Sequence, residues 1–139
     1  MTPVLERLLD LWRRPVVAGP DAETAFREVY ADPVTVNGTP MSVADLVQRA
    51  RMLQGAFTEL HMEVVHDYEL PSRIVVAFLM HGRHTGPLTT ALGTVAATGR
   101  AVTQRVTDIL TITEGRISDI WVIADELGVL QQLDAVRLA

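Results

Sequence analysis

The 139-residue sequence contains no cysteine and no lysine, and each absence excludes a class of function. Without cysteine, the chain has neither a disulfide framework nor a thiolate metal site. The basic residues are all arginines, and no basic run is longer than Arg13-Arg14. Because the formal net charge is −5, the chain lacks the basic surface that phosphate neutralisation requires, and we expect no nucleic acid partner.

Long apolar runs are also absent. No run approaches the roughly 18 residues that a membrane-spanning helix needs, and the N-terminus lacks the basic and apolar regions of a signal peptide. We therefore expect a cytoplasmic protein with no membrane partner. The composition, 48% hydrophobic and 21% charged, is typical of a folded chain, and the length predicts one domain over residues 1–139.

Hydrophobic periodicity divides the chain into helices followed by strands. Apolar residues at helical spacing predict helices over residues 2–14, 21–30 and 43–57. The period then changes from about 3.6 to 2, which predicts long strands over residues 59–70, 73–86, 100–113 and 116–125. Helices first and strands joined in sequence indicate an α+β fold, with an antiparallel sheet covered by helices on one face.

The long irregular segment is residues 85–99, between the second and third of these strands. Such a length exceeds that of an ordinary hairpin loop. Residues 87–97 are therefore either a lid over a pocket or a mobile surface connection, and the sequence leaves both open.

Alternation along the strands assigns side chains to faces. It places two carboxylates, Asp108 and Asp125, and two histidines, His66 and His84, on the inner face of the sheet. Their expected neighbours on this face are Met62, Tyr68, Phe78, Met80 and Trp121. This pattern predicts an apolar cavity with a few titratable groups, which suits acid/base chemistry on a small hydrophobic molecule.

Each of these residues also has a simpler interpretation. Asp125 precedes a predicted helix at residues 126–133 and is a suitable N-cap. Asp108 is a possible salt-bridge partner of Arg105 or of a helix arginine, and His66 is a possible hydrogen-bonded core residue. His81 and His84 are three apart on a strand and should face opposite ways, so no metal site is expected.

Several short motifs occur in a fixed order between residues 73 and 133: "GRHTG" at 82–86, "ATGRAV" at 97–102, "TDILTITEGRI" at 107–117 and "IWVIADELGVLQQL" at 120–133. In these motifs the sequence resembles the SnoaL-like polyketide cyclase family, within the superfamily named for nuclear transport factor two. The N-terminal half matches the family in its order of elements. The resemblance implies a cone-shaped α+β barrel, in which a strongly curved antiparallel sheet and N-terminal helices enclose an apolar pocket, and a homodimer paired through the outer sheet face.

The resemblance also implies an activity and a residue that carries it. Cyclases of the family close a ring by intramolecular aldol addition without a cofactor, and an aspartate at the end of the last strand, matching Asp125 here, moves the protons. The family carries a histidine on the preceding strand, and near the matching position this chain has Thr111. His84, Asp108 or His66 would therefore supply any second polar group. We expect a cyclase or isomerase acting on a hydrophobic, polyketide-like substrate.

Two other functions remain open. An epoxide hydrolase of the limonene epoxide hydrolase type needs two aspartates bridged by an arginine on one strand face, whereas Arg105 and Asp108 should face opposite ways. A non-catalytic protein that binds a hydrophobic ligand is the third possibility, because one fold can carry many functions.

Overall fold

The computed structural model describes residues 1–16 and 20–139. Three helices occupy most of the N-terminal part: α1 (Pro3–Arg13), α2 (Pro20–Val29) and α3 (Val43–Ala56). The Thr2 hydroxyl caps α1 by accepting the Leu5 amide at 3.2 Å, and the Ser42 hydroxyl caps α3 by accepting the Asp45 amide at 3.1 Å. Both caps satisfy amides that have no partner within the helix.

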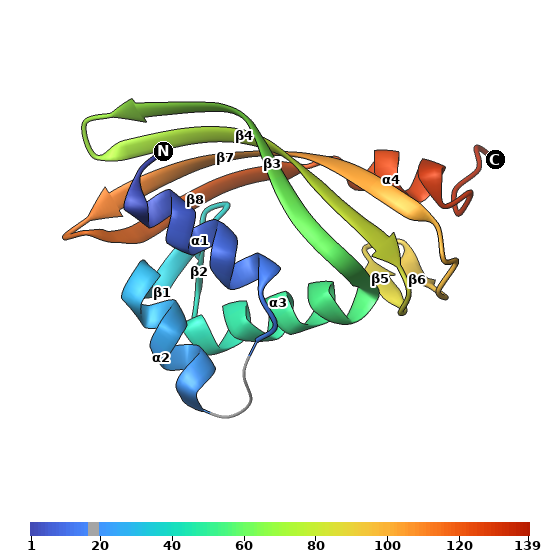
Figure 1. The fold of residues 1–139 in the computed structure, drawn as a ribbon, viewed down its shortest axis with the longest axis horizontal. Helices are drawn as coiled ribbons and strands as arrows, with labels where there is room; N and C mark the ends of the chain where they lie inside the picture. The colour runs from blue at the N-terminus through green and yellow to red at the C-terminus, as the bar shows by residue number, and fades with distance from the viewer. Residues whose placement is uncertain (17–19) are drawn as a thin grey trace.

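One six-stranded sheet forms the rest of the core, in the order β2-β1-β8-β7-β4-β3. Its strands are β1 (Tyr30–Val36), β2 (Thr39–Met41), β3 (Phe57–Leu70), β4 (Arg73–His84), β7 (Ala101–Thr113) and β8 (Arg116–Ala124). The sheet is strongly curved, and α1 and α3 lie against its concave face (Figure 1). The short helix α4 (Glu126–Gln132) follows β8.

The predicted α+β class and the long elements are confirmed, and two features of the topology differ. β1 pairs with β8 in the parallel direction, whereas every other pairing in the sheet is antiparallel. Residues 88–95 form a hairpin of two short strands, β5 (Leu88–Thr90) and β6 (Gly93–Val95), inside the segment predicted to be irregular. Strand order between distant segments depends on tertiary packing, which the periodicity of one strand does not contain.

A β-bulge in β8 reverses the predicted faces of that strand. Ile112 pairs with Ile117, but the preceding residue of β7, Thr111, pairs with Asp119, so Ser118 is an extra residue on β8. Because one extra residue moves every later side chain to the opposite face, Ile120 is buried and Trp121 is 52% exposed. The prediction that Trp121, Ile123 and Asp125 point inward is therefore wrong.

A second irregularity affects β3. Val64 pairs with Phe78, but His66 pairs with Ala77, so Val65 is the extra residue. The bulge reverses the faces of β3 after Val65. The prediction that His66 and Tyr68 lie on the inner face is therefore wrong, and both side chains are exposed. Their rings stack on each other with centroids 6.1 Å apart.

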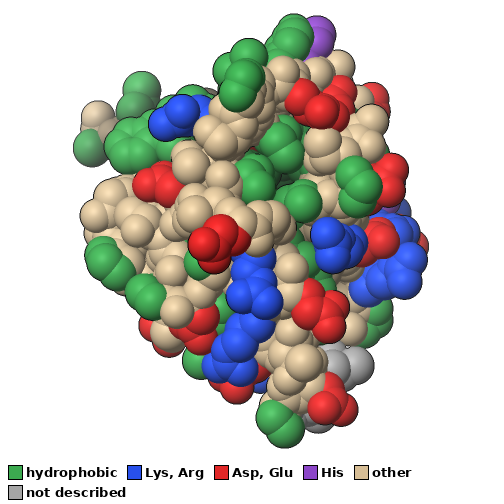
Figure 2. Space-filling view, turned by 90° about the vertical axis from the view of Figure 1, so that its left-hand side faces the viewer, with side chains coloured by type: hydrophobic (Ala, Val, Ile, Leu, Met, Phe, Trp, Pro, Cys, Tyr) green, Lys and Arg blue, Asp and Glu red, His purple; other side chains and the backbone are tan. Residues whose placement is uncertain are grey.

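Within the described part of the chain, no helix has the length and apolar character needed to cross a membrane. Acidic and basic side chains lie interspersed over the face drawn in Figure 2.

Candidate active site

A cavity of about 210 Å³ lies between the concave face of the sheet and helices α1 and α3. Its wall is mainly apolar, and three of the residues predicted to bind substrate, Met62, Phe78 and Met80, line it. The polar side chains of the lining come from four different elements: Trp12, Tyr30, Arg49, Gln104 and Asp108. An apolar cavity with a few polar groups is the usual form of a small-molecule site.

Asp108 is the acidic group of this cavity. It lies on β7 between Val76 of β4 and Val122 of β8, and it is 7% exposed. Its Oδ1 atom is buried without a hydrogen-bond partner among the described residues. Burial raises the pKa of Asp108 to about 7, because the surroundings disfavour the charged form. The predicted inward orientation of Asp108 is confirmed, and its carboxyl is poised to exchange a proton near neutral pH.

Tyr30 places a hydroxyl in the same cavity. The Nε1–H group of Trp12 donates to the Tyr30 Oη atom at 2.7 Å, which links α1 to the first residue of β1. Burial raises the pKa of Tyr30, and the charge of nearby Asp108 raises it further, against the lowering effect of the Trp12 hydrogen bond. Tyr30 therefore stays protonated and is able to donate a hydrogen bond to a bound molecule.

Arg49 is the cationic side chain of the lining. It lies on α3 between Leu46 and Leu53, which also line the cavity, and it is exposed. The guanidinium therefore stands where the cavity meets solvent, whereas Asp108 is enclosed.

The structure places Asp125 outside the cavity lining. Its Oδ1 atom accepts the Gly128 amide at 2.9 Å and caps α4, and its Oδ2 atom accepts Arg105 Nη2 at 2.9 Å. The Arg105 guanidinium and the Gly128 amide together hold the pKa of Asp125 below its ordinary value. The simpler interpretation of Asp125, a helix cap in contact with solvent, describes its position.

His84 is fully buried at the end of β4 and is not among the residues that line the cavity. Its Nδ1 atom accepts the Thr98 amide at 3.2 Å and contacts the Thr98 hydroxyl at 3.0 Å. The ring of Phe57 packs beside it, with centroids 5.7 Å apart. His84 thus holds residues 98–100 against the sheet, and the structure does not bring it together with Asp108.

The second glycine of the "GRHTG" motif, Gly86, marks a close backbone contact. The Gly86 amide donates to the Ala56 carbonyl at 3.1 Å, and a Cβ atom at Gly86 would overlap the carbonyl oxygen of Gly55. The atoms that this Cβ would meet are the carbonyl oxygen and carbon of Gly55, and backbone atoms cannot move aside as a flexible side chain can. We therefore expect Gly86→Ala to lower the free energy of unfolding by about 3 kcal/mol. Urea denaturation measures this loss.

Gly55→Ala is the matched control for this prediction, because a Cβ atom at Gly55 has nothing within 4 Å. Gly55 lies in the last turn of α3, so alanine there should leave the stability unchanged or raise it by up to about 1 kcal/mol. Equal stabilities of the two variants would contradict the proposed contact.

The structure also bears on the other interpretations raised by the sequence: a lid, a hydrolase site and a metal site. Neither strand of the β5–β6 hairpin contributes to the cavity lining. Arg105 pairs with Asp125 and faces away from Asp108, so the described residues do not form the two-aspartate and arginine arrangement of the hydrolase type. Over residues 1–16 and 20–139, no group of three His, Asp or Glu side chains is arranged to hold a metal ion.

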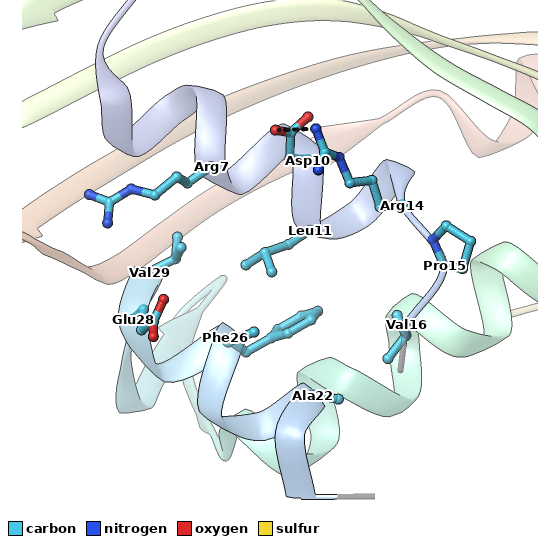
Figure 3. A pocket seen from close by; sticks show the side chains of 11 residues that line it. Arg7, Asp10, Leu11, Arg14, Pro15, Val16, Ala22, Phe26, Glu28 and Val29 are labelled. Carbon is cyan, nitrogen blue, oxygen red and sulfur yellow. Dashed lines mark ion pairs between the residues drawn. The ribbon is translucent and has the colours of Figure 1, made fainter. Parts of the chain in front are cut away.

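A second hollow, of about 270 Å³, lies between α1 and α2 (Figure 3). Charged side chains surround it, and Arg14 pairs with Asp10 at 3.4 Å across its edge. None of the residues predicted to form a site lines it, and the Asp10 and Arg14 side chains are solvent-exposed. Most of its lining is apolar, including Leu11, Phe26 and Val29, and its charged groups lie at a solvent-exposed edge.

Of the polar residues that line the cavity, Trp12, Tyr30, Arg49 and Gln104 are not among the predicted site residues, and Tyr30 and Arg49 illustrate why. Periodicity assigns Tyr30 to the end of the second helix, but it begins β1. Arg49 stands beside the apolar stripe of its helix, three residues after Leu46 and four before Leu53. That spacing is the available signal, because residues three and four apart share a helix face.

Comparison with solved structures supports the cone fold. TsrD from Streptomyces laurentii is 18% identical, with a TM-score of 0.79 over 96% of this chain and 93% of that one. IdmH from Streptomyces antibioticus is 18% identical, with a TM-score of 0.73 over 94% and 96%. A SnoaL-like polyketide cyclase from Agrobacterium tumefaciens is 15% identical, with a TM-score of 0.72 over 96% and 99%. At these identities the likeness concerns the fold.

The family comparison covers nearly the whole chain. The family described as SnoaL-like polyketide cyclase matches residues 3–133, which include the helices as well as the motifs of the strands. None of the curated proteins compared with the chain matches it. Since the family match extends over α1, the cavity and α4, this chain belongs to the SnoaL-like polyketide cyclase family.

Proposed function

We propose that the protein is a cofactor-independent acid/base enzyme that closes or isomerises a carbon skeleton in a small hydrophobic compound, and that Asp108 moves the proton. The observation that carries this proposal is the position of Asp108: a buried carboxyl with an unpaired oxygen in an apolar cavity. The family supports the reaction type, and the burial of Asp108 supports its role in place of Asp125.

The proposed reaction consists of two proton transfers and one bond-forming step. The Asp108 carboxylate takes a proton from a carbon next to a carbonyl, which leaves an enolate. The enolate carbon attacks a second carbonyl of the same molecule, and the resulting alkoxide receives the proton from the Asp108 carboxyl. The carbonyl oxygens of the substrate carry the developing negative charge, the Tyr30 hydroxyl is available as a donor, and the cavity supplies position and desolvation.

Proton exchange tests this proposal without knowledge of the natural substrate. We expect the protein to accelerate deuterium incorporation next to the carbonyl of tetralone, a bicyclic ketone, in D₂O followed by NMR. Because the base is the ionised form of Asp108, the rate should rise with pH and level off above a midpoint of about 7.

One alternative has an observation in its favour. Asp125, the residue that the family resemblance implies as the base, is a helix cap, which agrees with a protein that binds a hydrophobic ligand without chemistry. Such a protein would bind tetralone and leave its exchange rate unchanged. That result would replace the enzymatic proposal with the binding one.

We also propose that the protein pairs as a homodimer through the outer face of the sheet. Four neighbouring strands present a row of apolar side chains there, because Tyr68 is opposite Val75, Val75 is opposite Ile109, and Ile109 is opposite Trp121. Tyr68, Ile109 and Trp121 are 57%, 39% and 52% exposed. A contiguous exposed apolar surface of this kind is typical of an interface.

Sedimentation equilibrium tests the dimer. Trp121→Glu should convert a dimer into a monomer, because it buries a charge within the proposed interface. Met52→Glu changes a residue of similar exposure on α3, away from the sheet, and should leave the dimer intact. A wild-type protein that sediments as a monomer at micromolar concentration would reject the interface.

A further inference from the structure

The cavity lining carries one acidic and one cationic side chain, which differ in burial. Asp108 is enclosed by strands β4, β7 and β8, whereas Arg49 lies on α3 at the exposed edge of the lining. The walls between them are mainly apolar, and the other polar lining groups, Trp12, Tyr30 and Gln104, are uncharged at neutral pH. A bound molecule therefore meets one cation at the opening and one acid inside.

Arg49 has no charge partner among the described residues. The ion pairs of the structure use other arginines, and Asp45, one helical turn before Arg49, forms none with it. No hydrogen bond of the described residues involves its guanidinium either. An arginine that borders an apolar cavity and keeps its donors unused is available to a carboxylate, which it binds with two parallel hydrogen bonds.

We propose that the cavity takes a hydrophobic carboxylic acid, whose carboxylate pairs with Arg49 while its apolar body extends inward to Asp108. This inference rests on the proposed function, because it assigns the substrate class of the same site. The size is consistent, since a cavity of ~150 Å³ holds benzene and this one measures about 210 Å³. A compound of one or two rings with an acidic substituent therefore fits.

The charges also fix the direction in which such an acid enters. Its carboxylate is attracted to Arg49 and repelled by the ionised form of Asp108, so the reversed orientation is disfavoured. The end of the molecule that reaches Asp108 is then the uncharged one, where a carbonyl and its neighbouring C–H group would lie. Arg49 is thus a specificity-determining and positioning residue, and it does not exchange protons.

Isothermal titration calorimetry with naphthoate and naphthamide tests this inference, because the two probes share a ring system and differ in charge. We expect the wild-type protein to bind naphthoate about tenfold more tightly than naphthamide, as one charge-assisted pair at an exposed edge allows. Arg49→Gln should remove this preference by weakening naphthoate alone, and Arg49→Lys should keep part of it. Because Arg49 is exposed, the preference should also shrink at high ionic strength.

Arg116→Gln is the matched control. It removes the same charge from an exposed residue at the start of β8, outside the cavity lining, and should keep the wild-type preference. Equal binding of the two probes by wild-type protein, or a preference that survives in Arg49→Gln, would overturn the inference. Thermal unfolding of Arg49→Gln should match wild type, which separates lost recognition from lost folding.

The same measurements separate this inference from the proposed function. Preference for naphthoate without any deuterium exchange of tetralone would keep the acid-binding site and reject the enzyme. Exchange that depends on Asp108, together with equal binding of both probes, would keep the enzyme and reject the carboxylate. If neither probe binds wild-type protein at its solubility limit, the inference is rejected.

Discussion

Asp108→Asn is expected to lower the rate of protein-catalysed deuterium exchange at least 100-fold, because a positioned general base contributes about 10² to 10⁴ in rate. Asparagine keeps the size of the side chain and cannot accept the proton at neutral pH. The pH dependence should disappear with the activity, since the midpoint of about 7 belongs to this carboxyl. NMR of tetralone in D₂O over a range of pH measures both effects.

Asp125→Asn is the comparison that identifies the acting carboxylate. Asparagine also caps helices, and it loses the charge that pairs with Arg105 on the solvent side. We expect this variant to retain exchange within a factor of about three, because no atom of Asp125 belongs to the cavity lining. If Asp125→Asn loses the activity and Asp108→Asn retains it, the assignment of Asp108 is wrong.

Asp108→Asn should also stabilise the protein at alkaline pH. The pKa of Asp108 is higher in the folded state, about 7, than in the unfolded chain, about 4, so the unfolded chain releases this proton more readily. The free energy of unfolding of the wild type therefore falls as pH rises from about 4 to about 7 and is constant above. Its loss across this range is of the order of 4 kcal/mol.

Urea denaturation at pH 5 and pH 8 measures this prediction. The asparagine side chain does not ionise, so the variant should gain most of those roughly 4 kcal/mol over wild type at pH 8 and only about 1 kcal/mol at pH 5. A difference between variant and wild type that is the same at both pH values would show that Asp108 is not held neutral by burial. If Asp108→Asn loses deuterium exchange and gains stability at pH 8, the wild-type protein keeps the Asp108 carboxyl for its activity although this carboxyl lowers the stability of the fold.

The parts of this fold that the sequence predicts well are those governed by local periodicity. The apolar stripes of α1 and α3 and the inward position of Asp108 follow from spacing within one element. The α+β class follows from the order of helices and strands. The parallel pairing of β1 with β8 could not be predicted, because those strands are separated by most of the chain.

The candidate site is harder to predict because it depends on the faces of strands. Val65 and Ser118 are each one extra residue at a bulge, and neither has a distinctive sequence signal. Strict alternation therefore places His66, Tyr68, Trp121 and Asp125 on the inner face, which the structure contradicts. Alternation remains reliable in β7, whose pairing with β4 is regular throughout, and there it identifies Asp108.

The extra residue Ser118 is absorbed locally and leaves the inner and outer faces of β8 as they would be without it. If Ser118 were deleted, the pair Ile112–Ile117 would be followed directly by the pair Thr111–Asp119, and Ile120, Val122 and Ala124 would still line the cavity. Evolution could therefore gain or lose this codon with the cavity wall, the surrounding helices and the rest of the sheet in place. When relatives are aligned along β8, a one-residue gap at Ser118 keeps residues of the same site in the same column, whereas a gap-free alignment shifts them to the opposite face.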